Sequence, residues 1–230
     1  MIKKIFFWGA KYKAGIINDL IENHKILANT KKLCVKFLFD PNLDKAKFLS
    51  KAKFSNKKDD LKKFLRQSDY FVTCVGSEYG KARYLISKEL EKKKLKPLKI
   101  ISKHAYISDI NSVGKGVQAF PNSVIHHQTQ IGDYCILNTG SIVEHDCILG
   151  NGVHIMPGAV IGGNTNIGKY VTVGLNATIM PQLKIGEGSF IGAGSVISKN
   201  VLPYTDIIGT PGKYMRKNRL IYNDDIFRAM

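Results

Sequence analysis

The sequence predicts an N-terminal α/β domain followed by an all-β parallel β-helix. A six-residue period runs from Val113 to Leu202, and before it apolar, strand-like runs alternate with helical stretches. Charge separates the same regions: residues 1–103 hold 26 Lys and Arg against 10 Asp and Glu, whereas residues 104–230 hold 9 against 8. Such a split indicates two differently built regions. We expect domains at 1–103 and 104–203, and a closing segment at 204–230.

The period divides residues 113–202 into fifteen six-residue units without remainder. Fourteen first positions are Val, Ile or Leu, with Ala119 as the exception, and eight second positions are Gly. Most fifth positions are small or β-branched, as at Ser123 and Cys147. Repetition at this period is typical of a parallel β-helix, in which each unit supplies a short strand and a corner. Three units make one 18-residue coil, so five coils form a prism roughly 24 Å tall.

The N-terminal region reads as strand and helix in alternation. Expected strands are 4–8, 34–39 and 70–75, and expected helices are 14–27, 60–66 and 81–95. This order predicts a small parallel sheet with Rossmann-like crossovers, whose ligand lies at the carboxyl ends of the strands. Those ends carry residues 9–13, 39–41 and 74–77. The G-x-G-x-x-G fingerprint of NAD-binding domains is absent.

Composition argues against several classes of protein. No apolar run approaches the roughly 20 residues that span a bilayer, so we expect no membrane insertion and a cytoplasmic location. The four cysteines have no C-x-x-C spacing, which argues against a metal clip or a disulfide scaffold. The 30 Lys against 5 Arg favour solvated helix faces over nucleic-acid binding, for which Arg is preferred. A positive domain would nevertheless attract an anionic substrate.

His145 is the strongest candidate for chemistry. It is the third residue of its unit, where side chains point away from the axis, and His127 lies one coil earlier on the same face. The flanking Glu144 and Asp146 would fix its tautomer and raise its basicity as a general base. Sequence alone does not choose between these carboxylates, because neighbouring strand residues point to opposite faces.

Other chemistries find weaker support. A metal site at His126, His127 and His145 would leave only two imidazoles on one face. No G-x-S-x-G elbow indicates a serine nucleophile, and thiols at buried fifth positions are inert.

The six-residue repeat resembles that of the left-handed parallel β-helix acyltransferases. The segment Ile142–Cys147 (IVEHDC) is similar to the active-site segment of bacterial sugar acetyltransferases, the bacillosamine N-acetyltransferase and sialic acid O-acetyltransferase group. This resemblance implies a left-handed coil and a homotrimer with active sites between neighbouring prisms. It also implies that His145 is the base and that Asp146 tunes it.

The same resemblance implies two sets of binding residues. Those matching contacts of the co-substrate acetyl-CoA are His154, Gly163, Gly174, Leu175 and Ala193. The N-terminal region resembles the nucleotide-sugar-binding domain of the bacillosamine acetyltransferase group, and the residues expected on the acceptor are Lys11, Tyr12, Lys13, Asp40, Pro41, Gly76 and His127. The chain departs from the group at residues 11–13, where Lys-Tyr-Lys replaces a turn containing Gly and His.

The resemblance, with His145 as the candidate base, implies an acetyl-CoA-dependent N-acetyltransferase acting on a nucleotide-linked 4-amino-4,6-dideoxy sugar for surface glycan synthesis. O-acetylation of sialic acid or another sugar is the alternative within enzymes, and a non-catalytic β-helix scaffold is the alternative outside them. Residues 209–213 (GTPGK) resemble the segment that closes the coil in these transferases. We expect residues 214–230 to form a short helix that covers the last coil.

Overall fold

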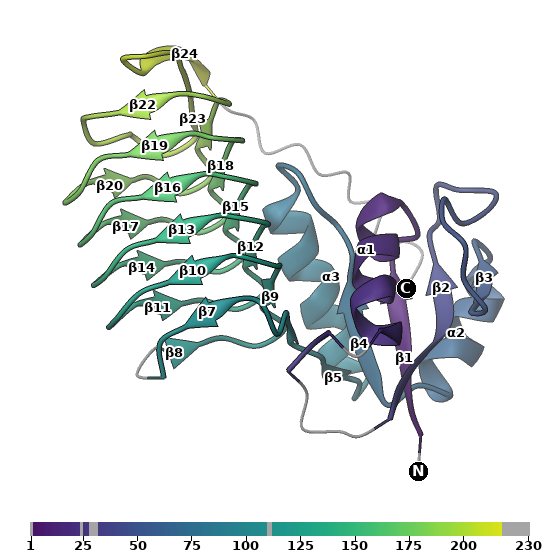
Figure 1. Cartoon of the computed structure of the whole chain (residues 1–230). Coiled ribbons are helices and arrows are strands. Elements are labelled where there is room, and N and C mark those ends of the chain that lie inside the picture. Colours follow the sequence, from purple (N-terminus) through teal and green to yellow (C-terminus); the bar gives the residue numbers. More distant parts are fainter. Residues whose placement is uncertain (1, 24, 28–31, 110–111, 218–230) are drawn as a thin grey trace.

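The structure is a computed structural model that describes residues 2–23, 25–27, 32–109 and 112–217. A mixed α/β region packs against the lower coils of a triangular prism of short parallel strands (Figure 1). Within the described residues, no helix is long and apolar enough to cross a membrane.

The α/β region is built on one five-stranded parallel sheet in the order β3-β2-β1-β4-β5. Its elements are β1 (Lys3–Trp8), α1 (Tyr12–Glu22), β2 (Leu33–Phe39), β3 (Lys53–Ser55), α2 (Lys58–Arg66), β4 (Tyr70–Thr73), α3 (Gly80–Lys92) and β5 (Lys96–Pro97). The predicted alternation is wrong at one point, because β3 follows β2 without a helix between them. The sequence expectation also omitted β3 and β5, since runs of two or three residues carry no periodic signal.

Apolar side chains cover both faces of this sheet. On one face, Ala14 and Ile17 of α1 pack with Phe120 and Ile136 of the prism. On the other face, the core joins α2, α3 and the aromatic residues of β1 and β2, and it reaches Tyr134 of the prism. The α/β region therefore shares its hydrophobic core with the coils instead of being tethered to them.

Three sheets form the faces of the prism. The covered face, which meets the α/β region, contains β6 (Ile100–Ile101), β9 (Gln118–Ala119), β12 (Ile136–Leu137), β15 (His154–Ile155), β18 (Thr172–Val173), β21 (Phe190–Ile191), β23 (Thr205–Ile208) and β24 (Lys213–Lys217). The apolar face contains β7 (Tyr106–Ile107), β10 (Val124–Ile125), β13 (Ile142–Val143), β16 (Val160–Ile161), β19 (Thr178–Ile179) and β22 (Val196–Ile197). The polar face contains β8 (Ser112–Val113), β11 (Gln130–Ile131), β14 (Ile148–Leu149), β17 (Asn166–Ile167) and β20 (Lys184–Ile185).

The predicted period and its phase are confirmed. Strands one coil apart pair in parallel with an offset of 18 residues, as Val124, Ile142 and Val160 do. First-position residues such as Leu137 and Ile155 are fully buried along the axis, and fifth-position Ser123 and Cys147 are buried at the corners. The coil also begins earlier than predicted, because β6, β7 and β8 form one further coil ahead of the repeat that starts at Val113. Residues 100–112 lack the six-residue consensus from which the other coils were predicted.

The second-position glycines are explained by the spacing of the coils. A Cβ on Gly132 would lie 2.7 Å from the backbone nitrogen of Asn151 in the next coil. Close stacking of coils thus requires them. The left-handed conformation falls on the fourth position of each unit from 113 to 196, on Gly140 and Gly158 but also on Asn164 and Asp146.

Arg83 of α3 joins the α/β region to the coils. Its side chain is completely buried, and its guanidinium donates four hydrogen bonds to main-chain carbonyls. Nε reaches the Tyr134 carbonyl at 2.8 Å, and Nη2 reaches the Gly152 carbonyl at 2.7 Å, both at corners of the prism. Burial lowers the pKa of Arg83 to about 10, so the group stays charged at neutral pH.

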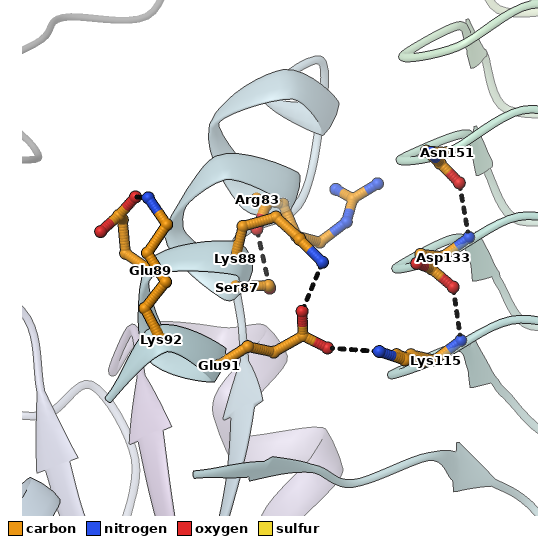
Figure 2. A network of polar contacts seen from close by, with 9 residues as sticks. All are labelled: Arg83, Ser87, Lys88, Glu89, Glu91, Lys92, Lys115, Asp133 and Asn151. Carbon is orange, nitrogen blue, oxygen red and sulfur yellow. Dashed lines mark hydrogen bonds and ion pairs between the residues drawn. The ribbon is translucent and has the colours of Figure 1, made fainter. Parts of the chain in front are cut away.

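A polar ladder borders this joint on the solvent side (Figure 2). Glu91 of α3 pairs with Lys88 on its own helix and with Lys115 on the prism. The ladder continues up the corner, since Asp133 accepts from the Lys115 backbone N–H at 2.8 Å and the Asn151 side chain accepts from the Asp133 backbone N–H at 2.9 Å. The ladder thus links α3 to three successive coils.

The end of the chain corrects one expectation. Residues 213–217 form β24, which pairs antiparallel with β23, so the predicted helix does not begin at residue 214. Arg216 anchors the strand by an ion pair with Asp206 at 2.6 Å. The rest of the predicted helix, residues 218–230, lies outside the described residues.

We predict that Arg83→Met lowers the free energy of unfolding by about 3 kcal/mol or more, because four buried carbonyls lose a charged donor. Urea unfolding followed by circular dichroism measures the change. Arg66→Met, at an exposed site on α2, is the matched control and should leave the midpoint unchanged. An unchanged midpoint for Arg83→Met would show that the joint contributes little to stability.

Candidate active site

His145 and Asp146 form a pair at the edge between the apolar and polar faces. His145 Nδ1 lies 2.7 Å from Asp146 Oδ2, and both side chains are about half exposed to solvent. Because a carboxylate accepts, the ring donates from Nδ1, and the lone pair of Nε2 stays available as a base. Of the two carboxylates left open by the sequence, Asp146 is therefore the partner of the imidazole.

The corner geometry decides this pairing. Asp146 has φ of 55° and occupies the left-handed fourth position of its unit. Its backbone N–H donates to the carbonyl of His127 in the coil before, at 3.0 Å. The strand rule that sends neighbours to opposite faces does not apply at such a corner, so His145 and Asp146 meet although they are consecutive. Glu144 is half buried, and in the described part of the chain its side chain makes no hydrogen bond to the ring.

Gly163 lies directly beside the His145 ring. A Cβ on Gly163 would be 2.7 Å from His145 Nε2 and 2.8 Å from Cε1. Gly163 occupies the third position one coil after His145, just as His127 occupies it one coil before. His145 thus lies in one column with Gly163, a predicted acetyl-CoA contact, and His127, a predicted contact of the acceptor sugar. Because Gly163 has no side chain, the ring has room on that side.

Three further predicted donor residues lie on another edge. Gly174, Leu175 and Ala193 occupy corners between the covered and apolar faces, and the full width of the apolar face separates them from the His145 edge. Leu175 is 49% exposed. Gly174 is required by coil stacking, since a Cβ there would be 2.6 Å from the Ile191 carbonyl oxygen. One chain does not bring the two sets together.

His154 lies inside the contact between the α/β region and the covered face. Its side chain is 3% exposed, and Nδ1 donates to the Ser77 carbonyl at 3.1 Å. Nε2 is 3.3 Å from the amide nitrogen of Asn138, which donates to it. Burial, followed by the charges of Lys13 and Arg83, holds the pKa of His154 well below its usual range. The ring is therefore neutral and bridges the two regions.

The carboxyl edge of the parallel sheet gathers most of the predicted acceptor residues. Asp40, which follows β2, is buried and accepts from the backbone N–H of Ala10 and of Asn42, both at 3.1 Å. The carboxylate thereby holds the turn after β1 against the turn after β2. Lys11 and Tyr12 are exposed at the start of α1, with Tyr12 75% exposed, and Pro41 follows Asp40.

Lys13 and Gly76 meet between β1 and β4 at the same edge. A Cβ on Gly76 would be 2.6 Å from Lys13 Cε, so the lysine side chain runs across the glycine. Lys13 Nζ lies 5.0 Å from the centre of the Phe120 ring, which belongs to the prism. These two acceptor residues therefore adjoin the coil, whereas Lys11 and Tyr12 face solvent.

Sequence reasoning missed two residues of this junction. Ser77, in a left-handed conformation with φ of 49°, and Asn138 position the buried ring of His154. Ser77 lies in the predicted strand end at 74–77, but its carbonyl, not its side chain, makes the contact. No side-chain pattern signals such a bond. Among the described residues, no group of three or more His, Cys, Asp or Glu is arranged to hold a metal ion.

We predict that acid destabilises the protein partly through His154. The unfolded chain takes up a proton near pH 6.5 whereas the buried ring does not, so stability is present above that pH and falls below it, by at most about 2 kcal/mol between pH 7 and 5. Urea unfolding at both pH values measures this loss, which should shrink in His154→Gln. The exposed His104→Gln is the control. Equal losses in wild type and His154→Gln would contradict the assignment.

Comparisons with known proteins agree with this architecture. Residues 129–163 and 164–199 match the family model described as the bacterial transferase hexapeptide (six repeats). Both segments lie within the coils and include the His145 corner. A comparison with curated protein sequences found no match.

Solved structures resemble nearly the whole chain. A mutant of perosamine N-acetyltransferase from Caulobacter crescentus, in complex with CoA and GDP-perosamine, has a TM-score of 0.80 at 19% identity over 94% of this chain and 98% of that one. The acetyltransferase domain of PglB from Neisseria gonorrhoeae FA1090, in complex with acetyl coenzyme A, gives 0.79 at 23% over 94% and 100%. WeeI from Acinetobacter baumannii AYE gives 0.75 at 23% over 93% and 100%. The chain thus carries the bacterial transferase hexapeptide repeat and shares the fold of sugar acetyltransferases, which confirms the predicted resemblance.

Proposed function

We propose that the protein is an acetyl-CoA-dependent N-acetyltransferase whose acceptor is a nucleotide-linked amino sugar, of the 4-amino-4,6-dideoxy kind, destined for a surface glycan. The observation that carries the proposal is the His145–Asp146 pair, which leaves Nε2 available as a base on a hexapeptide coil. The match to a transferase repeat and the fold shared with enzymes crystallised with CoA support it.

The chemistry follows from the pair. Acetyl-CoA supplies an activated acetyl group as the thioester. The acceptor amine attacks the thioester carbonyl, and His145 Nε2 takes the proton that the amine loses. The C–S bond then breaks and the imidazolium gives this proton to the sulfur, so that CoA leaves as the thiol. Asp146 stabilises the imidazolium because it already holds Nδ1–H at 2.7 Å. Positioning of the two substrates supplies much of the rate, since an amine needs only modest help from a base.

The α/β region provides the acceptor site in this proposal. Its strand order reverses at β1, with β2 on one side and β4 on the other, and ligands of parallel α/β sheets bind outside the carboxyl ends at such a switch point. Lys13, Asp40 and Gly76 stand there. We therefore infer a Rossmann-like domain that binds the nucleotide part. Structures of the same fold hold GDP-perosamine, which supports this inference.

The site further requires a second copy of this chain. His145 and three of the proposed donor residues, Gly174, Leu175 and Ala193, lie on opposite edges of the apolar face, so one prism does not bring them together. From β10 to β22 the outward side chains of that face are half buried and mostly aliphatic: Val124, Ile142, Val160, Thr178 and Val196. On β7 the outward residue is the exposed Tyr106. An aliphatic stripe of this kind is typical of an interaction surface. We infer a homotrimer of left-handed coils, in which each apolar face meets a neighbouring prism.

We predict that His145→Ala lowers CoA release from acetyl-CoA and a nucleotide-linked 4-amino-4,6-dideoxy sugar by roughly 10²- to 10⁴-fold, because the base is lost. Asp146→Asn should cause an intermediate loss. A thiol-detecting assay with UDP-, dTDP- and GDP-linked amino sugars and with free sialic acid measures the rates.

The control for this assay is His104→Ala, an exposed histidine away from the His145 edge. It should keep wild-type turnover, and size-exclusion chromatography should show all variants assembled alike. Wild-type turnover by His145→Ala would reject the role of His145. Turnover with sialic acid alone would change the reaction to O-acetylation, and no CoA release with any acceptor would contradict the enzyme assignment.

We predict that Val160→Lys, in the middle of the apolar face, dissociates the assembly and abolishes turnover, since three charges would be buried in each trimer. Light scattering coupled to size exclusion measures the mass. Lys184→Glu, on the polar face, is the control and should remain assembled. A monomeric wild type, or a Val160→Lys protein that stays assembled, would overturn the proposed interface.

A further inference from the structure

The connection between β2 and β3 presents a leucine to solvent among lysines. Leu49 lies near its middle and is 99% exposed, more than any other large apolar side chain of the described residues. The segment around it holds one acidic and four basic residues, all exposed: Asp44, Lys45, Lys47, Lys51 and Lys53. Because β3 is an edge strand, this connection lies on the side of the α/β region that is remote from the prism (Figure 1).

The inner side of the same connection is packed. Its other apolar side chains lie against the core on the α1 face of the sheet: Leu43, Ala46, Phe48 and Ala52. Phe48 covers Gly15 of α1, where a Cβ would be 3.0 Å from Phe48 Cβ. The backbone N–H of Lys47 donates to the Ala10 carbonyl at 2.9 Å. The connection is therefore held in place with Leu49 on its outer side, away from the core that its apolar neighbours reach.

The adjoining surface of α1 adds a second apolar side chain. Ile16 follows Gly15, the residue that Phe48 covers, and is 52% exposed. Ile16 and Leu49 are thus each one residue away from a direct contact between the helix and the connection. We refer to the following residues as the Leu49 patch: Ile16, Lys45, Lys47, Leu49 and Lys51.

The lysines of the Leu49 patch have no counter-charge on the protein. In the part of the chain that the structure describes, no carboxylate lies within ion-pair distance of Lys45, Lys47 or Lys51. Their ammonium groups are therefore available to an anionic partner, and the apolar side chains between them are available to an apolar one.

The composition of the patch distinguishes between classes of partner. Protein interfaces are enriched in Tyr, Trp and Arg and depleted in Lys, and nucleic acids are read chiefly by Arg. The Leu49 patch contains neither Arg nor an aromatic residue. Lysine next to aliphatic side chains suits a lipid surface, because the ammonium groups reach the headgroups while their stems and the aliphatic neighbours lie deeper.

We propose that the Leu49 patch attaches the protein to the surface of a bilayer that contains anionic lipids. The lysines pair with lipid phosphates, and the side chains of Leu49 and Ile16 enter the boundary between headgroups and acyl chains. The attachment is peripheral, since no helix among the described residues could span a bilayer. This inference goes beyond the proposed function and does not depend on it.

The test is co-sedimentation of the full chain with vesicles of phosphatidylcholine alone and of phosphatidylcholine mixed with phosphatidylglycerol. We expect wild type to sediment with the mixed vesicles only, and less so at high salt, which screens the lysines. The double variant Lys45→Ser/Lys51→Ser should bind roughly 25-fold more weakly, at about fivefold for each lysine. Leu49→Ser should bind roughly tenfold more weakly, because its side chain no longer enters the apolar layer.

Two controls match these variants. Lys62→Ser/Lys93→Ser removes two exposed lysines from α2 and the end of α3, and so gives the same net charge as the patch double variant. Leu202→Ser removes a leucine that is 77% exposed on the prism. Both controls should bind mixed vesicles as wild type does, and all variants should keep the wild-type melting temperature because the changed side chains are exposed.

Several results would overturn the proposal. Wild type that stays in the supernatant with mixed vesicles would do so, as would unchanged binding by both patch variants. An equal loss in Lys62→Ser/Lys93→Ser would assign the attachment to total charge instead of the patch. Self-association of wild type that Leu49→Ser abolishes, without vesicle binding, would assign the patch to contacts between copies of the chain.

The CoA-release assay without vesicles separates this inference from the proposed function. Wild type and both patch variants should turn over alike, since the patch acts on the location of the protein and not on the reaction. Vesicle binding that depends on the patch, in a protein that releases no CoA, would support the attachment while the transferase assignment fails. A Leu49→Ser protein that binds vesicles normally but loses turnover would overturn the attachment and leave the transferase assignment in place.

Discussion

The buried guanidinium of Arg83 is the contact on which the relation between the two regions depends. Main-chain carbonyls are weak anchors individually, but four of them around one charged donor replace the water that the cation has lost. Two of these carbonyls belong to successive corners of the prism, so α3 is held in one register along the coil axis. The shared apolar cores then make the joint continuous, and the carboxyl edge of the parallel sheet keeps a constant position against β15.

The edges of the prism carry its candidate catalytic side chains. Its repeat offers one outward third position per corner, and His145 uses one on an edge where the preceding coil carries His127 and the next carries Gly163. The left-handed fourth position turns Asp146 back onto the ring. A rigid parallel scaffold thereby presents a paired imidazole without a supporting loop. The same regularity places Gly174, Leu175 and Ala193 a full face away from His145.

Three basic residues, Arg83, His154 and Lys13, lie at the junction between the α/β region and the prism. Arg83 is satisfied by carbonyls and His154 is kept neutral, but Lys13 remains a cation without a counterion among the described residues. The surrounding N-terminal region is strongly basic, so its field attracts anions from a distance.

Sequence alone determined the coil, its phase and the outward position of His145. Every 18-residue coil imposes the same steric requirements, so the pattern repeats over ninety residues. It also located three of the sheet strands and the edge that carries Lys13, Asp40 and Gly76. Strand alternation left both Asp146 and Glu144 open, and the tertiary structure pairs Asp146 with the ring, because a positive φ at a corner cancels that alternation. Only the structure, likewise, placed Arg83, Ser77 and Asn138, whose contacts run through main-chain carbonyls or across 16 to 77 residues of sequence and leave no local pattern.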